Sequence, residues 1–140
     1  MSAIDIQSRV TSVLASGLPW LVAEEEGTVL GYAYAHPWAE RRGYRTSVEC
    51  SVYLAHDATG RGLGRQLYAE LFRLLRQRAD LHIVIGGVAL PNEASVALHK
   101  SFGFEKVAHF KEVGTKFGTM IDVAYFQLWL HPEPNQPPPR

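Results

Sequence analysis

Residues 59–76 read TGRGLGRQLYAELFRLLR, a glycine-rich turn followed by a run of helical character. Leucines recur at helical spacing in this run and the charged side chains fall outside their stripe, which predicts an amphipathic helix. The glycines let successive backbone N–H groups converge at the helix N-terminus, where the helix dipole favours a phosphate. The stretch therefore predicts a turn that holds a phosphorylated ligand, although a tight strand-to-helix connection would use similar residues.

The segment before this turn alternates as a strand with one packed face does. Its apolar face carries Val48, Cys50, Val52 and Leu54, and its polar face carries Glu49, Ser51 and Tyr53. Upstream, two β-prone runs, Leu21 to Glu25 and Val29 to His36, are separated by Glu26-Gly27-Thr28, which predicts a hairpin.

Two further helices are predicted. One runs from Ile4 to Leu14 and is ended by Ser16-Gly17-Leu18-Pro19. A buried strand at Ile83 to Leu90 precedes the other, which Pro91-Asn92-Glu93 opens and Gly103 closes.

The C-terminal part predicts two more strands, Phe104 to Glu112 and Ile121 to Leu130, joined by a loop at Val113 to Gly118. We expect one α/β (α+β) domain over residues 1–130, with a mixed, mostly antiparallel sheet and helices on both faces. Residues 131–140 are too rich in proline for regular structure and predict a flexible tail.

Composition excludes several classes of protein. The chain has 140 residues and a formal net charge of zero, so it lacks the basic footprint of a nucleic-acid or anionic-membrane protein. The single cysteine, Cys50, excludes an internal disulfide, and no apolar run approaches the ~20 residues that span a bilayer. The N-terminus lacks the features of a signal peptide, which predicts a cytoplasmic protein.

Two common phosphate motifs do not fit the glycine-rich turn. A P-loop needs a lysine followed by serine or threonine after its glycines, and this chain has neither there. A dinucleotide fingerprint needs a third glycine where Leu67 stands.

The turn does resemble a known acetyltransferase pattern. Thr59 to Gly64 resembles the Arg/Gln-x-x-Gly-x-Gly pyrophosphate loop of the Gcn5-related N-acetyltransferases (GNAT), and Asn92 to Phe104 resembles their second CoA segment. Further segments resemble the phosphinothricin and methionine sulfoximine acetyltransferase branch: 17–23, 31–35, 48–53, 98–99 and 113–118. The resemblance implies a GNAT fold and transfer of acetyl from acetyl-CoA to the primary amine of a small amino-acid-like acceptor.

The resemblance also assigns the acetyl-CoA site. It implies contacts from the loop residues Thr59, Gly60, Arg61, Gly62, Leu63, Gly64 and Arg65, and from Asn92 and Ser95. The Val52-Tyr53-Leu54 backbone is expected to pair with the pantetheine arm. Thr59 stands where the family usually has arginine or glutamine, so we expect weaker CoA binding, not its loss. Asn92 as a plain helix N-cap is a compatible alternative.

Two residues are candidates for proton transfer. An ammonium has no lone pair, so an acceptor amine must lose a proton, and Glu49 matches the position implied for that base. His99 stands where many relatives carry a tyrosine that protonates the leaving thiolate; a hydrogen-bonded structural histidine is the alternative. Alternation places Cys50 on the packed face, where it is a poor nucleophile.

Four residues lie in segments that border the acceptor cleft of this family: Tyr34, Tyr44, Arg45 and Lys116. Hydroxyl and cationic groups suit the oxyanions of an amino-acid-like acceptor. Two other functions stay open, acetylation of a protein or peptide amine and CoA binding without catalysis. The histidines show no metal-ligand spacing, so we predict no metal.

Relatives begin with a further strand and helix before the segment that matches Ile4. Their absence predicts an exposed edge on the strand at Leu21 to Glu25 and uncovered apolar surface, which together favour a homodimer.

Overall fold

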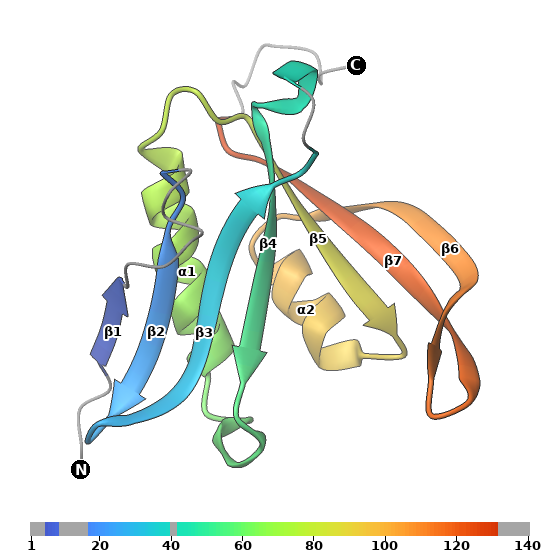
Figure 1. Ribbon diagram of the computed structural model, residues 1–140, viewed down its shortest axis with the longest axis horizontal. Coiled ribbons are helices and arrows are strands. Elements are labelled where there is room, and N and C mark those ends of the chain that lie inside the picture. The colour runs from blue at the N-terminus through green and yellow to red at the C-terminus, as the bar shows by residue number, and fades with distance from the viewer. Residues whose placement is uncertain (1–4, 9–16, 40–41, 132–140) are drawn as a thin grey trace.

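The computed structural model describes residues 5–8, 17–39 and 42–131. They form a seven-stranded sheet of order β1-β2-β3-β4-β5-β7-β6 with two α-helices (Figure 1). The strands are β1 (Asp5–Ser8), β2 (Trp20–Glu25), β3 (Thr28–Pro37), β4 (Ser47–Leu54), β5 (Ile83–Leu90), β6 (Glu105–Lys116) and β7 (Thr119–Trp129). The helices are α1 (Leu63–Arg76) and α2 (Glu93–Ser101), and the 3-10 turns are η2 (Arg42–Tyr44) and η3 (His56–Ala58).

The sheet is mixed and mostly antiparallel, as predicted. Every neighbouring pair of strands is antiparallel except β4 and β5, which run parallel. The connection between these two strands contains α1, as a parallel pair requires.

The N-terminal segment contains a strand where a helix was predicted. β1 pairs antiparallel with β2, with Asp5 opposite Glu24 and Ser8 opposite Leu21. The free edge of β2 offers a row of backbone hydrogen-bonding groups, and pairing with them outweighs a weak helical spacing of three apolar residues. The helix prediction over Ile4 to Leu14 is therefore wrong at residues 5–8, and residues 9–14 lie outside the described ones. The expected open edge on β2 is also wrong, because β1 covers it.

Two hairpins turn at pairs of residues with positive φ. The β2–β3 hairpin turns at Glu26 (φ 52°) and Gly27 (φ 82°), which confirms the predicted turn. The β6–β7 hairpin turns at Phe117 (φ 51°) and Gly118 (φ 77°). The loop predicted at Val113 to Gly118 is therefore wrong over its first four residues, which belong to β6, because a two-residue turn is enough to reverse the chain.

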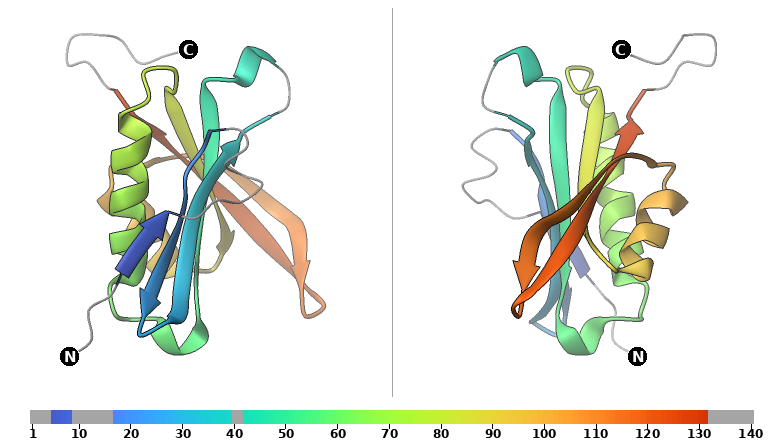
Figure 2. Two further views of the ribbon diagram at one scale, coloured as in Figure 1. Left: turned by 60° about the vertical axis from the view of Figure 1, so that its left-hand side comes forward. Right: turned by 90° about the vertical axis from the view of Figure 1, so that its right-hand side faces the viewer.

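Both helices lie on one face of the sheet (Figure 2). α1 packs on β2, β3 and β4, and α2 packs on β5. Four leucines of the predicted stripe are buried, Leu63, Leu67, Leu71 and Leu75, and the predicted Leu74 is partly buried. Tyr68 and Phe72, which the prediction did not include, are buried beside them. At roughly 2 kcal/mol for each buried large side chain, this stripe is the main anchor of the helix. Among the described residues, helices thus cover one face only, where helices on both faces were expected. No described helix has the length and apolarity needed to cross a membrane.

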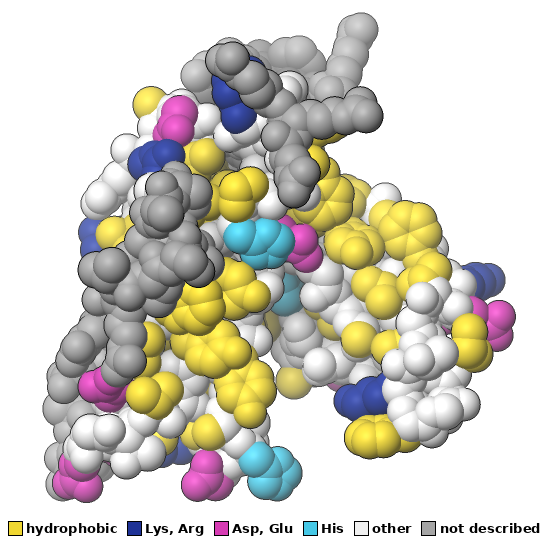
Figure 3. Space-filling model, in the orientation of Figure 1, with side chains coloured by type: hydrophobic (Ala, Val, Ile, Leu, Met, Phe, Trp, Pro, Cys, Tyr) yellow, Lys and Arg dark blue, Asp and Glu magenta, His cyan; other side chains and the backbone are white. Residues whose placement is uncertain are grey.

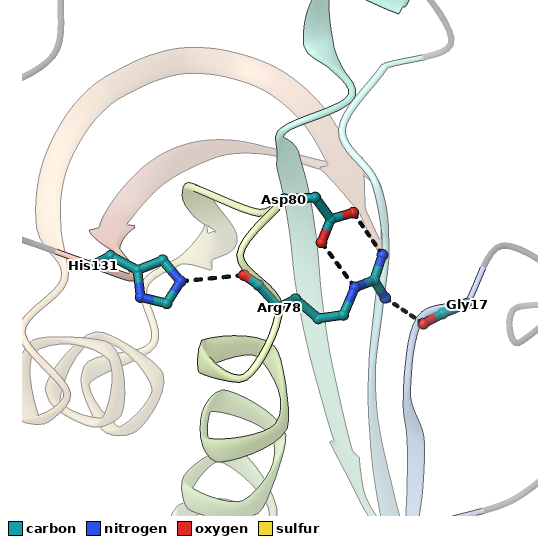
Figure 4. Close-up of polar contacts among 4 residues, drawn as sticks. All are labelled: Gly17, Arg78, Asp80 and His131. Atoms are coloured by element: carbon teal, nitrogen blue, oxygen red, sulfur yellow. Dashed lines mark hydrogen bonds and ion pairs between the residues drawn. The ribbon is translucent and has the colours of Figure 1, made fainter.

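An arginine ties the start of β2 to the α1–β5 connection (Figure 4). Arg78 makes a bidentate contact with Asp80 (2.9 and 2.8 Å) and donates to the Gly17 carbonyl (2.5 Å). The His131 ring donates to the Arg78 carbonyl (3.2 Å), which brings the end of β7 to the same point. These contacts gather three chain segments at the end of the sheet where β4 and β5 are paired.

Candidate active site

β4 and β5 part from each other halfway along their length. They pair from Ser47 opposite Ile83 to Cys50 opposite Gly86, and no further pair joins them. β3 stays paired with β4 as far as Leu54, and β7 stays paired with β5 as far as Leu90, so the two halves of the sheet separate beyond this point (Figure 1). Beyond Cys50, none of the described strands pairs with this edge of β4. An extended ligand placed there would find backbone groups to pair with.

The glycine-rich turn lies where β4 leads into α1. Gly60 (φ 79°) and Gly62 (φ 76°) both have positive φ, and a Cβ at either position would face open space. Gly62 is the N-cap of α1, and as a glycine it has no side chain with which to cap the helix. The first helical hydrogen bond runs from the Gln66 N–H to the Gly62 carbonyl (3.1 Å), so the three preceding amides have no helical acceptor. The turn therefore offers converging N–H donors that an anion can approach closely.

The side chains of this turn make local contacts. The Thr59 hydroxyl donates to the His56 carbonyl (3.2 Å), and Arg61 pairs with Glu25 of β2 (2.9 Å). The Arg65 guanidinium lies 5.5 Å from the centroid of the Phe102 ring. Anion binding at the turn would therefore depend on backbone amides more than on these side chains.

The start of α2 borders a pocket. Asn92 is the N-cap, and its Oδ1 accepts from the Ser95 N–H (3.1 Å), as the cap alternative predicts. The pocket is lined by the end of β5 and by α2, including Leu90, Val96 and Lys100. The structure thus places Asn92 beside a hollow at the end of β5, and Ser95 is held to it through the cap contact.

Glu49 lies on the sheet face opposite the helices, as the alternation predicted. Its carboxylate is half-buried, 3.6 Å from Nε2 of His36, its cross-strand neighbour on β3. On the β5 side it faces Gly87, whose missing side chain leaves room for Glu49 and for the ring of Tyr125. Glu49 therefore stands beside the point where β4 and β5 separate.

An aromatic array continues from this pair across the same face. Tyr34 stacks on Trp20 with ring centroids 4.4 Å apart, and Tyr32 stacks on Tyr53 at 5.3 Å. Tyr34 also lies 5.8 Å from the His36 ring. Figure 3 looks onto this face and shows apolar side chains on both sides of a hollow, with a histidine and an acidic side chain near its closed end.

The four acceptor candidates lie on different segments of the chain. Tyr44 and Arg45 are exposed and precede β4, whereas Lys116 lies at the tip of the β6–β7 hairpin (Figure 1). Tyr34 joins the Glu49 surroundings through His36. Sequence reasoning missed His36 as a site residue, although the two-residue alternation of Tyr32, Tyr34 and His36 placed all three on one face.

His99 is buried on the helix side of the sheet, 2% exposed. Its Nδ1 lies 2.7 Å from the Ser95 carbonyl, which can only accept, so Nδ1 carries the proton of the neutral ring. Nε2 then presents a lone pair and has no hydrogen-bond partner among the described residues. Burial lowers the pKa of His99, which favours this neutral form. The general-acid role stays a prediction, and this geometry is closer to that of a structural histidine.

We expect His99→Phe to weaken the pH dependence of the unfolding free energy below about pH 6.5. The depressed pKa means that the unfolded chain takes up this proton first. The stability that His99 contributes is therefore complete above about pH 6.5 and is lost as pH falls below it, by up to ~1.4 kcal/mol per pH unit. Denaturant unfolding between pH 7.5 and 5 measures this. His56→Gln, at an exposed histidine, serves as the control, and parallel profiles for wild type and His99→Phe would contradict the assignment.

The Cys50 thiol is a poor nucleophile. Its side chain is buried on the helix side of the sheet, and burial raises the pKa of the thiol to about 12. A thiol of this kind stays protonated at neutral pH, and only the thiolate is a strong nucleophile. The alternation of side chains along β4 had predicted that Cys50 lies on the packed face and is a poor nucleophile.

Comparison with known proteins yields one family and several similar chains. Residues 4–125 match the acetyltransferase (GNAT) domain. The chain is 48% identical over 103 residues to a phosphinothricin N-acetyltransferase of Streptomyces coelicolor, covering 74% of this chain and 60% of that protein. It is 42% identical over 114 residues to an L-methionine sulfoximine/L-methionine sulfone acetyltransferase of Salmonella typhimurium, covering 81% and 66%.

A solved structure shares the fold. The phosphinothricin acetyltransferase of Sinorhizobium meliloti, in complex with acetyl-CoA, superposes with a TM-score of 0.83 at 34% identity, covering 91% of this chain and 69% of that one. The chain thus spans less than two thirds of the two curated relatives named above.

Proposed function

Because this chain belongs to the acetyltransferase (GNAT) domain family, we propose that it transfers an acetyl group from acetyl-CoA to the primary amine of a small amino-acid-like molecule. One observation carries the proposal. β4 borders the opening that forms where β4 and β5 separate beyond Cys50. The half-buried carboxylate of Glu49 lies at one end of this part of β4, and the uncapped amides of the glycine-rich turn follow its other end.

The glycine-rich turn is proposed to bind the donor. The amides from Arg61 to Arg65 would hold the pyrophosphate of acetyl-CoA, with Asn92 and Ser95 bordering the ligand from α2. The free edge of β4 at Val52 to Leu54 would pair with the pantetheine arm and orient the thioester at the opening. Acetyl-CoA supplies the acetyl group, and a metal forms no part of the proposal.

Glu49 is proposed as the general base. It accepts a proton from the acceptor ammonium, and the amine then attacks the thioester carbonyl. The backbone N–H groups of β4 would stabilise the oxyanion that develops. The departing thiolate takes a proton from solvent or, in the sequence hypothesis, from His99.

The acceptor class rests on the relatives and on the open face of the sheet. Relatives named for phosphinothricin and methionine sulfoximine act on small amino-acid analogues. Tyr34 next to the Glu49 surroundings, together with Tyr44, Arg45 and Lys116, would meet the oxyanions of such acceptors. A location in the cytoplasm, where acetyl-CoA is available, follows from the same proposal.

Thiol release from acetyl-CoA tests this function. We would compare release with no acceptor, with a panel of amino acids including phosphinothricin and methionine sulfoximine, and with a peptide bearing a free N-terminus. Acceleration by small acceptors supports the proposal, and acceleration by the peptide alone favours the protein-acetylating alternative. Tight acetyl-CoA binding without release would identify a non-catalytic CoA module.

A homodimer is part of the proposal, on a different surface from the one first expected. β6 lies at the edge of the sheet, and the β6–β7 hairpin exposes half or more of each of five apolar side chains: Val107, Phe110, Val113, Phe117 and Met120. An apolar edge strand gains from pairing with a second copy.

We expect Val113→Lys to convert this dimer to a monomer, because a lysine on an edge strand opposes pairing. Static light scattering across a concentration series measures the mass. Val29→Lys is the matched control, since Val29 is an exposed valine at the start of β3, far from β6 in the strand order. A monomeric wild type at tens of micromolar would rule the dimer out.

A further inference from the structure

We propose that His36 is a proton relay for the transfer reaction: it takes the proton that Glu49 receives from the acceptor amine and releases it to solvent. This inference rests on the proposed acetyl transfer and adds a second proton-transfer residue to the same site. The supporting observation is that the imidazole of His36 lies next to the carboxylate of Glu49.

The sheet register brings the two groups together. His36 on β3 is directly opposite Glu49 on β4, so both side chains leave the same face of the sheet. The distance from His36 Nε2 to Glu49 Oε1 is 3.6 Å, which suits an ion pair and is slightly long for a hydrogen bond. A small rotation of either side chain, or one water, is enough for proton transfer.

The other ring nitrogen sets the tautomer. His36 Nδ1 lies 3.0 Å from the Pro37 carbonyl. A carbonyl only accepts hydrogen bonds, so Nδ1 carries the proton of the neutral ring and Nε2 presents its lone pair to Glu49. Neutral His36 is therefore oriented to receive a proton from the carboxylic acid form of Glu49.

Solvent exposure gives the relay a direction. The side chain of His36 is 37% exposed and that of Glu49 is 26% exposed, so the imidazole is the more open of the two to water. Tyr34 of β3 lies next to His36, and Gly87 of β5 and Tyr125 of β7 lie next to Glu49. The buried Cys50 thiol and the Tyr68 phenol are also within electrostatic reach of Glu49. Among the groups named here, His36 carries the nitrogen base that can take a proton from Glu49.

The overall reaction releases a proton, which must pass from Glu49 to solvent in each turnover. An acceptor ammonium loses one proton to Glu49 before attack, and this proton passes to His36 and then to water. The new bond joins the amine nitrogen to the acetyl carbon, and the carbon–sulfur bond breaks. A second proton leaves the nitrogen and ends on the CoA sulfur. One proton per turnover therefore reaches solvent, and Glu49 must be deprotonated again before the next cycle.

Steady-state kinetics of His36→Gln against pH test the relay. We expect kcat near pH 7 to fall about 10-fold, less than for loss of Glu49 because water can also take the proton. The KM for acetyl-CoA should stay unchanged. An acid limb in the wild-type pH profile of kcat should be absent from the variant, because glutamine can neither accept nor release a proton. Free imidazole in the buffer should restore part of the variant's kcat and leave wild type unaffected.

Controls separate the relay from a structural role and from the function itself. His131→Gln replaces an exposed histidine two residues after the end of β7 and should match wild type. His36→Asn should repeat the defect of His36→Gln. The relay is refuted if both His36 variants keep the wild-type pH profile and free imidazole does not change their kcat. The proposed acetyl transfer still stands in that case if Glu49→Gln is slow. If wild type releases no thiol with any acceptor, both proposals fail.

Discussion

Gly62→Val is expected to abolish detectable acetyl-CoA binding while the domain stays folded. Gly62 has φ 76° and caps α1, so its backbone conformation aims the first amides of the helix at one point. A valine would strain this left-handed conformation and would also place methyl groups in the open space that the pyrophosphate is proposed to occupy. Isothermal titration calorimetry with acetyl-CoA measures the loss directly.

The fold should survive this change. A non-glycine residue in the left-handed region costs roughly 1–2 kcal/mol, somewhat more for a β-branched one, whereas domains are typically stable by about 5–15 kcal/mol. Gly118→Val is the matched control, because Gly118 has nearly the same φ of 77°, also faces open space and lies in the β6–β7 turn instead of the glycine-rich turn. Unchanged affinity in Gly62→Val, or equal losses in both variants, would refute the pyrophosphate assignment.

Glu49→Gln is expected to lower kcat about 100-fold or more with little change in acetyl-CoA affinity. The amide keeps the shape of the side chain between His36 and Gly87 but cannot accept the proton of the acceptor ammonium. The lost contact with His36 is a partly exposed pair, so its effect on stability should stay below about 1 kcal/mol. Initial rates of thiol release at saturating acceptor, from pH 6 to 9, measure the effect.

A matched glutamate shows whether the effect is local. Glu105→Gln removes an exposed carboxylate at the start of β6 and should leave kcat unchanged. Turnover of Glu49→Gln within a few-fold of wild type at every pH would mean that another group or water is the base.

The sequence by itself determined the elements whose signals are local. The apolar stripe from Leu63 to Leu75 defined α1, and the glycines before it predicted a tight turn at its start, where Gly60 and Gly62 have positive φ. Alternation along β4 placed Glu49 and Cys50 on opposite faces, since successive side chains of a strand must point to opposite sides. These features depend on residues that are close in the chain, and the structure reproduces them.

Only the tertiary structure decided the features that depend on distant partners. Residues Asp5–Ser8 form a strand because the edge of β2 is there to pair with, and β6 extends to Lys116 because β7 continues beside it. His99 is buried because α2 packs against Gly86 of β5, and His36 meets Glu49 because the register between β3 and β4 sets them opposite each other. Such contacts join residues far apart in the sequence, and local spacing cannot specify them because they form only when the whole sheet assembles.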